Sequence, residues 1–301
     1  MMRWDATERA AVVALLRRTP TEKDERALVQ RITETGSASV VLRERLDPVD
    51  LFSDPLEEAL AQAQAEIAAW EDQGIQVLAM GDRNYPHRLR DVFDRPAVLF
   101  ARGEVVAGDS GIAVVGSRSV SPRGCSDAAE LAARLVERHL TVVSGLAQGV
   151  DTVAHTSALD AGGRTVAVIG TGIQRTYPAA NRELQALIAE RGAVVSQFWP
   201  DRTPDKTTFP LRNGTMSGYA LATIIVEANE RSGTRIQARK AVEHGRPVIL
   251  MRSVVERTQW GREYAGKPDV HVAGDVEAAM TIVDDVLERP KQIERLLSGI
   301  G

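Results

Sequence analysis

The stretch Ile112-Ala-Val-Val-Gly-Ser-Arg118 decides the fold of this chain. Four apolar residues run directly into a glycine turn, and a helix-length segment follows. This pattern is typical of a buried strand in a parallel sheet. The same unit recurs along the rest of the chain. It predicts strands at Ile112–Val115, Thr141–Ser144, Thr165–Ile169, Val194–Gln197, Thr223–Val226, Val248–Met251 and Val270–Val272.

Helix-length segments separate these strands. They lie near Gly124–Arg138, Thr152–Ala161, Asn181–Arg191, Arg212–Ala220, Arg235–His244 and Val276–Leu287. Alternating strands and helices predict an α/β fold, a doubly wound and mostly parallel Rossmann-like sheet. Ligands of such sheets bind beyond the carboxyl ends of the strands, so the residues after each strand are the candidates for a site.

The first third of the chain has a different pattern. Apolar spacing near 3.6 predicts helices at Thr7–Arg18, Glu22–Thr35 and Pro55–Trp70, and two short strands follow within residues 74–103. We therefore expect a small helical domain at 1–72, lead-in strands at 73–108 packing on the main domain, a Rossmann-like domain at 109–290 and a tail at 291–301.

Composition limits the classes of function. The 301 residues include one cysteine and five scattered histidines, so we expect no disulfide and no metal site. No apolar run approaches the roughly 20 residues of a spanning helix, and the N-terminus lacks the apolar core of a secretion signal. We expect a cytoplasmic protein without a membrane partner.

The net charge of −4 conceals a basic segment. Residues 111–252 carry 17 Lys and Arg against 12 Asp and Glu, and this segment also holds the glycine turns. A local basic excess of this size is also ordinary on protein surfaces. Taken alone, it is compatible with an anionic partner but does not indicate one.

The residues after the predicted strands are similar in kind, since glycines and residues with hydroxyl or cationic side chains are frequent there. Glycines admit a close ligand, and hydroxyls can cap a helix or bind phosphate. The segment Phe209-Pro-Leu-Arg-Asn-Gly214 adds a guanidinium and an amide at a predicted helix start, where anions are favoured. The candidate phosphate-binding residues are Gly116, Ser117, Arg118, Ser144, Gly145, Gly149, Gly170, Gly172, Lys206, Arg212, Asn213, Ser232, Gly233 and Thr234.

Two common nucleotide motifs are missing. The chain has no GxGxxG directly after the first strand and no Walker loop. A bound nicotinamide dinucleotide and ATP hydrolysis are therefore disfavoured, and we expect no cofactor.

The motifs together resemble the DprA/Smf DNA-processing proteins. The resemblance covers some 180 residues, from Asp82, Tyr85-Pro86, Leu89 and Pro96–Phe100 onward. Its core motifs are Val114-Val-Gly-Ser-Arg118, Val143-Ser-Gly-Leu-Ala-Gln-Gly-Val-Asp151 with Ala154-His155, Val168-Ile-Gly-Thr-Gly172 leading to Tyr177-Pro178 and Asn181, Phe209-Pro-Leu-Arg-Asn213, and Val226-Glu-Ala228 with Ser232-Gly233.

The resemblance implies a Rossmann-like domain that binds single-stranded DNA in a positively charged pocket and forms a homodimer. Members of the family protect incoming DNA and help load the RecA recombinase during transformation and recombination, which requires no chemical step. Phosphate neutralisation and base stacking are the physical needs of such a site. The expected pocket support comes from Asp151, His155, Tyr177, Asn181, Phe209 and Glu227.

The sequence departs from the family pattern in three places. The usual Arg-Asn-Arg is Arg212-Asn213-Gly214 here, which predicts one pocket cation fewer unless Lys206, Arg175 or Arg235 compensates. The segment that follows, Thr215–Tyr219, lacks the customary apolar pattern. After Met251 the sequence leaves no room for the winged-helix module that many members append.

An enzymatic alternative remains open. Similar domains in LOG-type phosphoribohydrolases and nucleotide sensors bind nucleotides, and some cleave an N-glycosidic bond, which needs a carboxylate near the ribose. Glu227 and Asp151 are the candidate acids. Against this, Glu227 could accept hydrogen bonds from turn amides, Asp151 could cap the helix it precedes, and the PGGxGT signature of those enzymes is absent. His155 could touch ligand or be structural.

Overall fold

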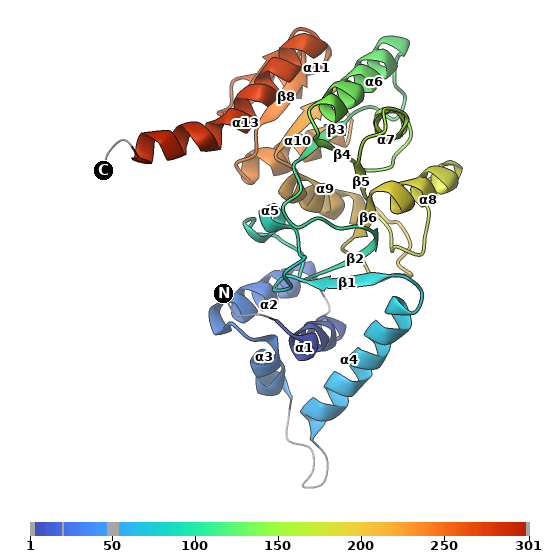
Figure 1. Cartoon of the computed structure of the whole chain (residues 1–301), viewed down its shortest axis with the longest axis vertical. Helices are drawn as coiled ribbons and strands as arrows, with labels where there is room; N and C mark the ends of the chain where they lie inside the picture. Colours follow the sequence, from blue (N-terminus) through green and yellow to red (C-terminus); the bar gives the residue numbers. More distant parts are fainter. Residues whose placement is uncertain (1–3, 20, 47–53, 299–301) are drawn as a thin grey trace.

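The computed structural model describes residues 4–19, 21–46 and 54–298 (Figure 1). Its N-terminal part is helical: α1 Ala6–Arg17, α2 Glu22–Thr35, α3 Ala38–Arg45 and α4 Pro55–Glu71. Three of these helices agree with the sequence patterns, whereas α3 was not predicted. It begins because Gly36 ends α2 in the left-handed conformation and the Ser37 hydroxyl accepts a hydrogen bond from the Val40 amide.

One nine-stranded sheet organises the rest of the chain, in the order β1-β2-β6-β5-β4-β3-β7-β8-β9. The seven predicted parallel strands are confirmed with ends shifted by about one residue. The strands are β1 Gln76–Ala79, β2 Val98–Gly103, β3 Gly111–Val115, β4 Thr141–Ser144, β5 Thr165–Val168, β6 Ala193–Ser196, β7 Ala222–Ile225, β8 Val248–Met251 and β9 Val270–Ala273.

Helices connect these strands. They are α5 His87–Arg90, α6 Pro122–Glu137, α7 Val150–Asp160, a 3-10 turn at Ala179–Asn181, α8 Arg182–Arg191, α9 Thr208–Tyr219, α10 Thr234–Glu243, α11 Arg252–Arg257, α12 Gln259–Ala265 and α13 Val276–Ser298. Helices α11 and α12 were not predicted, because each is too short to show a clear period. Helix α13 continues through the boundary that the sequence placed at residue 290.

The predicted start of α9 at Arg212 is wrong. The helix begins four residues earlier, at Thr208, because Pro210 is tolerated in a first turn. The Asp205 carboxylate accepts hydrogen bonds from the amides of Thr207 at 2.7 Å and Thr208 at 3.1 Å. Arg212 and Asn213 therefore lie in the second turn, away from the free amides of the helix start.

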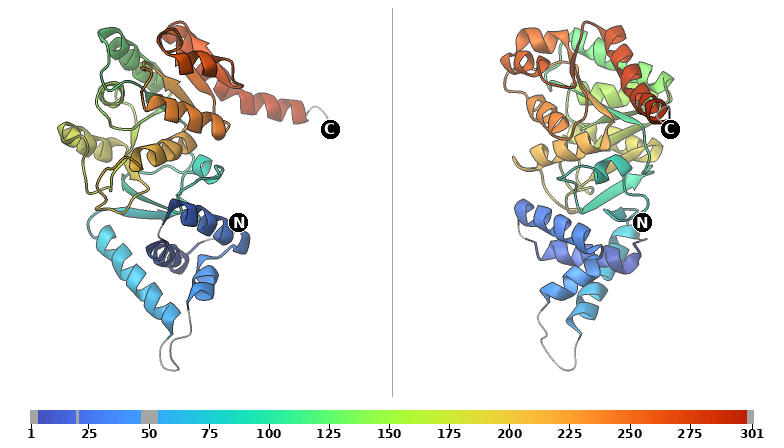
Figure 2. Two further views of the ribbon diagram at one scale, coloured as in Figure 1. Left: turned by 180° about the vertical axis from the view of Figure 1, so that it is seen from behind. Right: turned by 90° about the vertical axis from the view of Figure 1, so that its left-hand side faces the viewer.

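The alternation of apolar side chains along each strand puts helices on both faces of the sheet. Ile112 and Val114 of β3 point to the face covered by α6, α7 and α13, whereas Ala113 and Val115 point to the face covered by α9 and α10. Figure 2 shows these helix layers on either side of the strands. The predicted doubly wound, mostly parallel α/β fold is confirmed.

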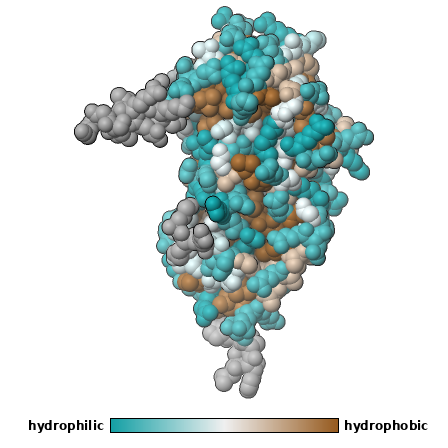
Figure 3. Space-filling model, viewed as in Figure 1, coloured by the Kyte–Doolittle hydropathy of each residue, from teal (hydrophilic) through white to brown (hydrophobic). Residues whose placement is uncertain are grey.

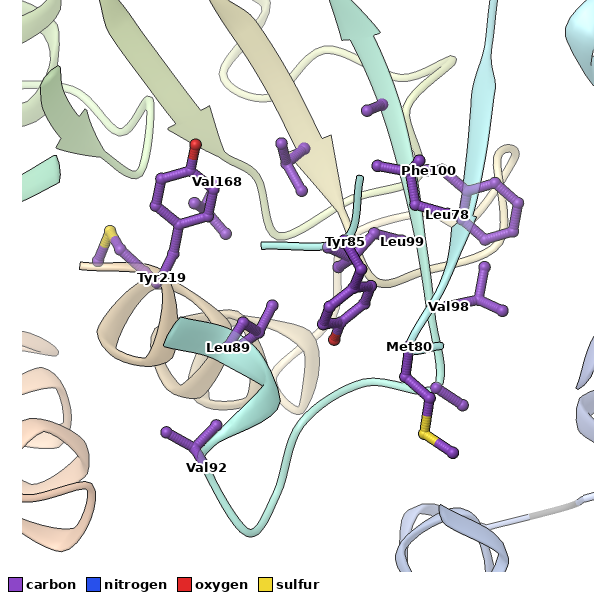
Figure 4. Close-up of a cluster of buried hydrophobic side chains, with 14 of the residues drawn as sticks. Leu78, Met80, Tyr85, Leu89, Val92, Val98, Leu99, Phe100, Val168 and Tyr219 are labelled. Carbon is purple, nitrogen blue, oxygen red and sulfur yellow. The ribbon is translucent and has the colours of Figure 1, made fainter. Parts of the chain in front are cut away.

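The lead-in segment extends the same sheet. Strand β2 pairs antiparallel with both β1 and β6. Figure 4 shows Tyr85 and Leu89, which precede β2, next to the core side chains of the lead-in strands and of Tyr219 in α9. Gly218 permits this packing, since a Cβ there would lie 2.5 Å from Leu89. The lead-in strands and main domain share one hydrophobic core.

The helical domain contacts strand β2 through the rings of Trp70 and Phe100, and it contacts the loop after β6 through an arginine. The guanidinium of Arg17 lies 3.9 Å from the ring centroid of Trp199, in the loop after β6, and Trp70 of α4 packs against the same ring. This contact holds the loop between β6 and α9 against the helical domain.

The surface seen in Figure 3 is mainly hydrophilic, with apolar residues in separate patches. Among the residues that the structure describes, no helix is both long enough and apolar enough to cross a bilayer.

Asp94 connects the lead-in segment to α10. Its carboxylate accepts from Lys240 Nζ at 2.5 Å and from His244 Nε2 at 2.6 Å, and His244 Nδ1 lies 3.0 Å from the Ser217 hydroxyl. Burial opposes ionisation of Asp94, but the hydrogen bonds and charges of His244 and Lys240 lower its pKa to about 2.

We expect Asp94→Asn to reduce the free energy of unfolding at pH 7 by about 1–2 kcal/mol. Because the folded-state pKa lies below the unfolded value of 3.8, this stabilisation is present above pH 4 and disappears as the pH falls toward 2. Urea titrations of both proteins between pH 2 and 7 measure it, with exposed Asp201→Asn as the control. A stability difference independent of pH would contradict this assignment.

Candidate functional site

A cavity of about 410 Å³ lies beyond the carboxyl ends of β3 and β7. From β3 the chain continues to β4, β5 and β6 on one side, and β7, β8 and β9 lie on the other. The strand order therefore reverses between β3 and β7, which is where ligands of doubly wound sheets bind. The volume is in the range of about 300–1,000 Å³ that ligand sites occupy. We call it the central cavity.

Ten of the residues selected from the sequence line this cavity. They are Gly116, Ser117, Arg118, Asp151, Phe209, Arg212, Asn213, Ser232, Gly233 and Thr234. The lining also includes residues that the sequence analysis missed, namely Val115, Ser119, Ala147, Met216, Asn229, Arg231 and Gln237.

Arg212 is the most buried cation of the central cavity, with 6% of its surface exposed. Its Nη1 donates to the Val168 carbonyl at 3.1 Å, at the end of β5, and its buried Nε has no hydrogen-bond partner among the described residues. Burial lowers the pKa of Arg212, and Arg118 acts in the same direction, while Asp151 opposes both. A buried donor without an acceptor is costly unless a ligand supplies one.

Asp151 partly balances this charge. Its carboxylate accepts from the backbone amides of Gly145 at 3.2 Å and Ala147 at 3.3 Å. It thus organises the loop after β4, and the suggestion that it caps α7 is wrong, since Gly149 is the N-cap. Burial raises the pKa of Asp151, while Arg212 and the loop amides lower it.

Arg118 and Phe209 of the cavity lining lie beside a second aromatic ring, that of Tyr177, which does not itself line the cavity. The Arg118 guanidinium lies 5.4 Å from the Phe209 ring centroid, and the Tyr177 ring lies 5.7 Å from Phe209. Tyr177 is 45% exposed, and Gly170 leaves room for Phe209, because a Cβ there would lie 2.7 Å from its ring. These rings offer a stacking surface beside positive charge.

Arg231 supplies a third cation. It is exposed, follows β7 and lines the central cavity, whereas Lys206, Arg175 and Arg235 do not. Ser232 was selected because it follows a predicted strand, and Arg231 follows the same strand. The sequence could therefore have identified Arg231 as well. With Asp151 as the one carboxylate in the described lining, three arginines make the cavity cationic.

The Gly214 departure does not remove a cation from this cavity. A Cβ at position 214 would face Asp94 Oδ2 at 3.4 Å and Lys240 at 3.8 Å. Residue 214 is two positions beyond Arg212, on the opposite side of α9. A side chain there would point toward the lead-in segment.

Several predicted residues support the loops without lining the central cavity. The Ser144 hydroxyl donates to the Val114 carbonyl, and the Asn181 amide donates to the Leu146 carbonyl and to Thr152. A Cβ at Gly172 would lie 2.2 Å from the Trp199 carbonyl oxygen, so glycine is needed there for packing. Lys206 is exposed outside the lining. Gly145, Gly149 and Gly170 belong to the same supporting group.

His155 is fully buried and does not reach the cavity. The Thr165 hydroxyl donates to the Val142 carbonyl, so the proton in its 2.7 Å contact with His155 belongs to Nδ1. Burial lowers the pKa of His155 to about 3, with Arg212 adding to the effect. The ring is neutral near pH 7 and acts in packing.

Glu227 follows β7, and its carboxylate reaches the N-cap of α6, outside the cavity lining. Its carboxylate accepts from the Ser121 amide at 3.2 Å and from the Ser121 hydroxyl, and its carbonyl accepts from the Ser117 amide at 2.8 Å. This confirms that Glu227 serves the turn amides. It is not placed to act on a sugar in the cavity, and Asp151 is held by loop amides.

A family model described as "DNA recombination-mediator protein A" matches residues 76–282. Among curated proteins, DNA processing protein DprA of Bacillus subtilis (strain 168) is 35% identical over 187 residues, 62% of this chain and 63% of the relative. DprA of Streptococcus pneumoniae (R6) is 42% identical over 171 residues, 56% of this chain and 60% of the relative. The chain thus matches less than two thirds of their length.

Solved structures share the fold. The X-ray structure of DprA from Streptococcus pneumoniae superposes with a TM-score of 0.70 at 25% identity, covering 93% of this chain and 98% of that one. DprA from Helicobacter pylori, whose structure was described for its single-stranded-DNA binding mode, gives a TM-score of 0.62 at 24% identity, covering 70% and 96%.

Proposed function

The chain belongs to the DNA recombination-mediator protein A family, the DprA/Smf DNA-processing proteins, and from this premise we propose that it binds single-stranded DNA in its central cavity. Binding would protect DNA for transformation and recombination without a chemical step. The H. pylori relative described as a single-stranded-DNA binder has the same fold, which supports this choice of ligand.

One observation carries the proposal, namely the convergence of Arg118, Arg212 and Arg231 on one cavity. They come from three different parts of the chain, and structural packing alone does not require three cations around a space with one carboxylate. Phosphates neutralise such a cluster, and the unpartnered Nε of Arg212 gains an acceptor.

The two aromatic rings support the same ligand. Phe209 and Tyr177 present rings beside Arg118, and bases of any sequence can stack on such rings. Sequence-tolerant binding needs this combination of phosphate contacts and stacking. The described side chains of the cavity offer no carboxylate free of backbone amides for glycosidic hydrolysis, so we do not propose a nucleotide N-glycosidase.

We expect Arg118→Ala to weaken binding of oligothymidine about tenfold at low salt, because an exposed phosphate contact is lost. The slope of log K against log salt should become less negative by about 0.7. Fluorescence anisotropy with labelled oligothymidine over a range of salt concentrations measures both quantities.

Arg45→Ala is the matched control, since it removes an exposed arginine on α3, far from the central cavity. Equal affinity losses in Arg118→Ala and Arg45→Ala would show that only net charge matters and would count against the site. No binding by the unaltered protein would overturn the proposed function.

The proposal includes a homodimer and assistance to a RecA-type recombinase. Both parts rest on family membership. The edge strand β9, with Val272 43% exposed, offers backbone groups that a second copy could pair with.

A further inference from the structure

A second hollow, of about 400 Å³, lies beside α8. We call it the α8 groove. Its polar and cationic lining side chains are Arg102, Gln174, Thr176, Arg182 and Gln185, and Ile173 lies beside them. The apolar side chains of Ala186, Ala189 and Val194 complete it. Figure 1 shows α8 at the flank of the sheet, next to the loop that follows β5.

An aromatic step connects the α8 groove to the central cavity. Phe209 lines the central cavity, and its ring lies 5.7 Å from that of Tyr177. Tyr177 directly follows Thr176, which lines the α8 groove. The Tyr177 ring therefore offers a stacking surface between Phe209 of the central cavity and the residue that lines the groove.

The charge of the groove fits a phosphate backbone. Arg102 and Arg182 line it, and the described lining contains no carboxylate. Arg182 is exposed at the start of α8, and neither arginine has a salt bridge among the described residues. Two cations above an apolar floor match a strand that presents phosphates outward and bases inward.

Gln185, which lines the groove, carries a buried polar atom without a hydrogen-bond partner among the described residues. The Gln185 Nε2 donates to the Arg175 carbonyl at 3.2 Å, which fixes the orientation of its amide. The other amide atom, Oε1, is buried without a partner among the described residues. This acceptor suits a base N–H group, because phosphates and deoxyribose in a chain offer no donor.

We propose that the α8 groove is a second subsite for single-stranded nucleic acid, continuous with the central cavity through Phe209 and Tyr177. Arg102 and Arg182 hold phosphates, and Gln185 Oε1 accepts from a base. The inference rests on the proposed function of the central cavity. It extends the bound strand along the β5–α8 loop.

Two oligothymidines separate the subsites, one of about 6 nucleotides that fills the central cavity and one of about 20 that also reaches the groove. We expect Arg102→Gln/Arg182→Gln to weaken the long oligonucleotide about tenfold and the short one by less than about twofold. The slope of log K against log salt for the long oligonucleotide should become less negative by about 1.4, for two lost phosphate contacts. Anisotropy titrations measure both.

Arg45→Gln/Arg191→Gln is the charge-matched control. Arg191 is exposed on α8 but lies nine residues from Arg182, on the opposite face of the helix. This control should leave both oligonucleotides unchanged. Arg118→Ala, by contrast, should weaken both lengths.

Three other outcomes would contradict the second subsite. Indistinguishable behaviour of the groove variant and the control overturns the second subsite and leaves the proposed function standing. Equal weakening of both lengths also overturns it, since the arginines would then act on the central cavity. Failure of the unaltered protein to bind either length overturns the proposed function and this inference together.

Discussion

Replacing Arg212 with methionine is expected to weaken oligothymidine binding about 100-fold, the largest binding effect of any single substitution in the central cavity. Methionine keeps most of the side-chain volume but removes the guanidinium. A bound phosphate then loses its contact with a buried cation. This contact contributes more binding free energy than the contact with exposed Arg118, because water screens the charge of Arg212 less.

The same substitution should lower the free energy of unfolding by about 2–3 kcal/mol, because buried Asp151 loses its favourable neighbour. Arg212→Met/Asp151→Asn is the matched test. Asparagine still accepts from a loop amide but carries no charge, so the double variant should recover stability without recovering binding. Urea denaturation and anisotropy report the two quantities separately.

Recovery of binding in the double variant would show that the loss came from loop distortion, and the role of Arg212 as a phosphate contact would be wrong. Wild-type affinity in Arg212→Met alone would exclude the central cavity as the DNA site.

Gly149→Ala is expected to have the largest effect on stability, lowering the free energy of unfolding by about 3–4 kcal/mol. Gly149 has φ +80°, and a Cβ there would lie 2.2 Å from the Ser117 carbonyl oxygen and 2.7 Å from that of Arg118. Both oxygens belong to the backbone, so neither can rotate away. The turn that carries Arg118 must move, and DNA binding should fall with stability.

Gly162→Ala isolates the cost of the backbone angle. Gly162 has φ +73°, but apart from its chain neighbours no atom of the described residues lies within 4 Å of the position that a Cβ would take. It should cost only about 1 kcal/mol. The difference between the two variants in urea denaturation measures the steric contact with the Ser117–Arg118 turn, and equal costs would contradict that contact.

Local sequence patterns predicted most of the fold. The four residues of β4 and the four of β8 were located without error, because runs of apolar residues between turns are local signals. The start of α9 was misplaced, since the pattern around Phe209-Pro210 does not show whether the proline follows a turn or occupies a first helical turn. The short helices α3, α11 and α12 were missed for lack of a period.

The candidate site was predicted in part. Arg118 was selected because it follows a strand and a glycine turn, and Arg212 because it stands at a predicted helix start; both line the central cavity. Arg231 also follows a strand, beside Ser232, but it was not selected. Glu227 and His155 were included because adjacent motifs drew attention to them, but sequence cannot show that one serves α6 and the other packs against Thr165.

The sequence by itself determined a doubly wound parallel sheet and the glycine and arginine character of its turns, because strand period and turn chemistry act over a few neighbouring residues. Only the tertiary structure decided that Arg118, Arg212 and Arg231 meet in one cavity, that Gly214 faces Asp94, and that the Tyr177 ring packs beside Phe209. Those relations depend on strand order and helix rotation, which bring together residues as far apart in the sequence as Arg118 and Arg231.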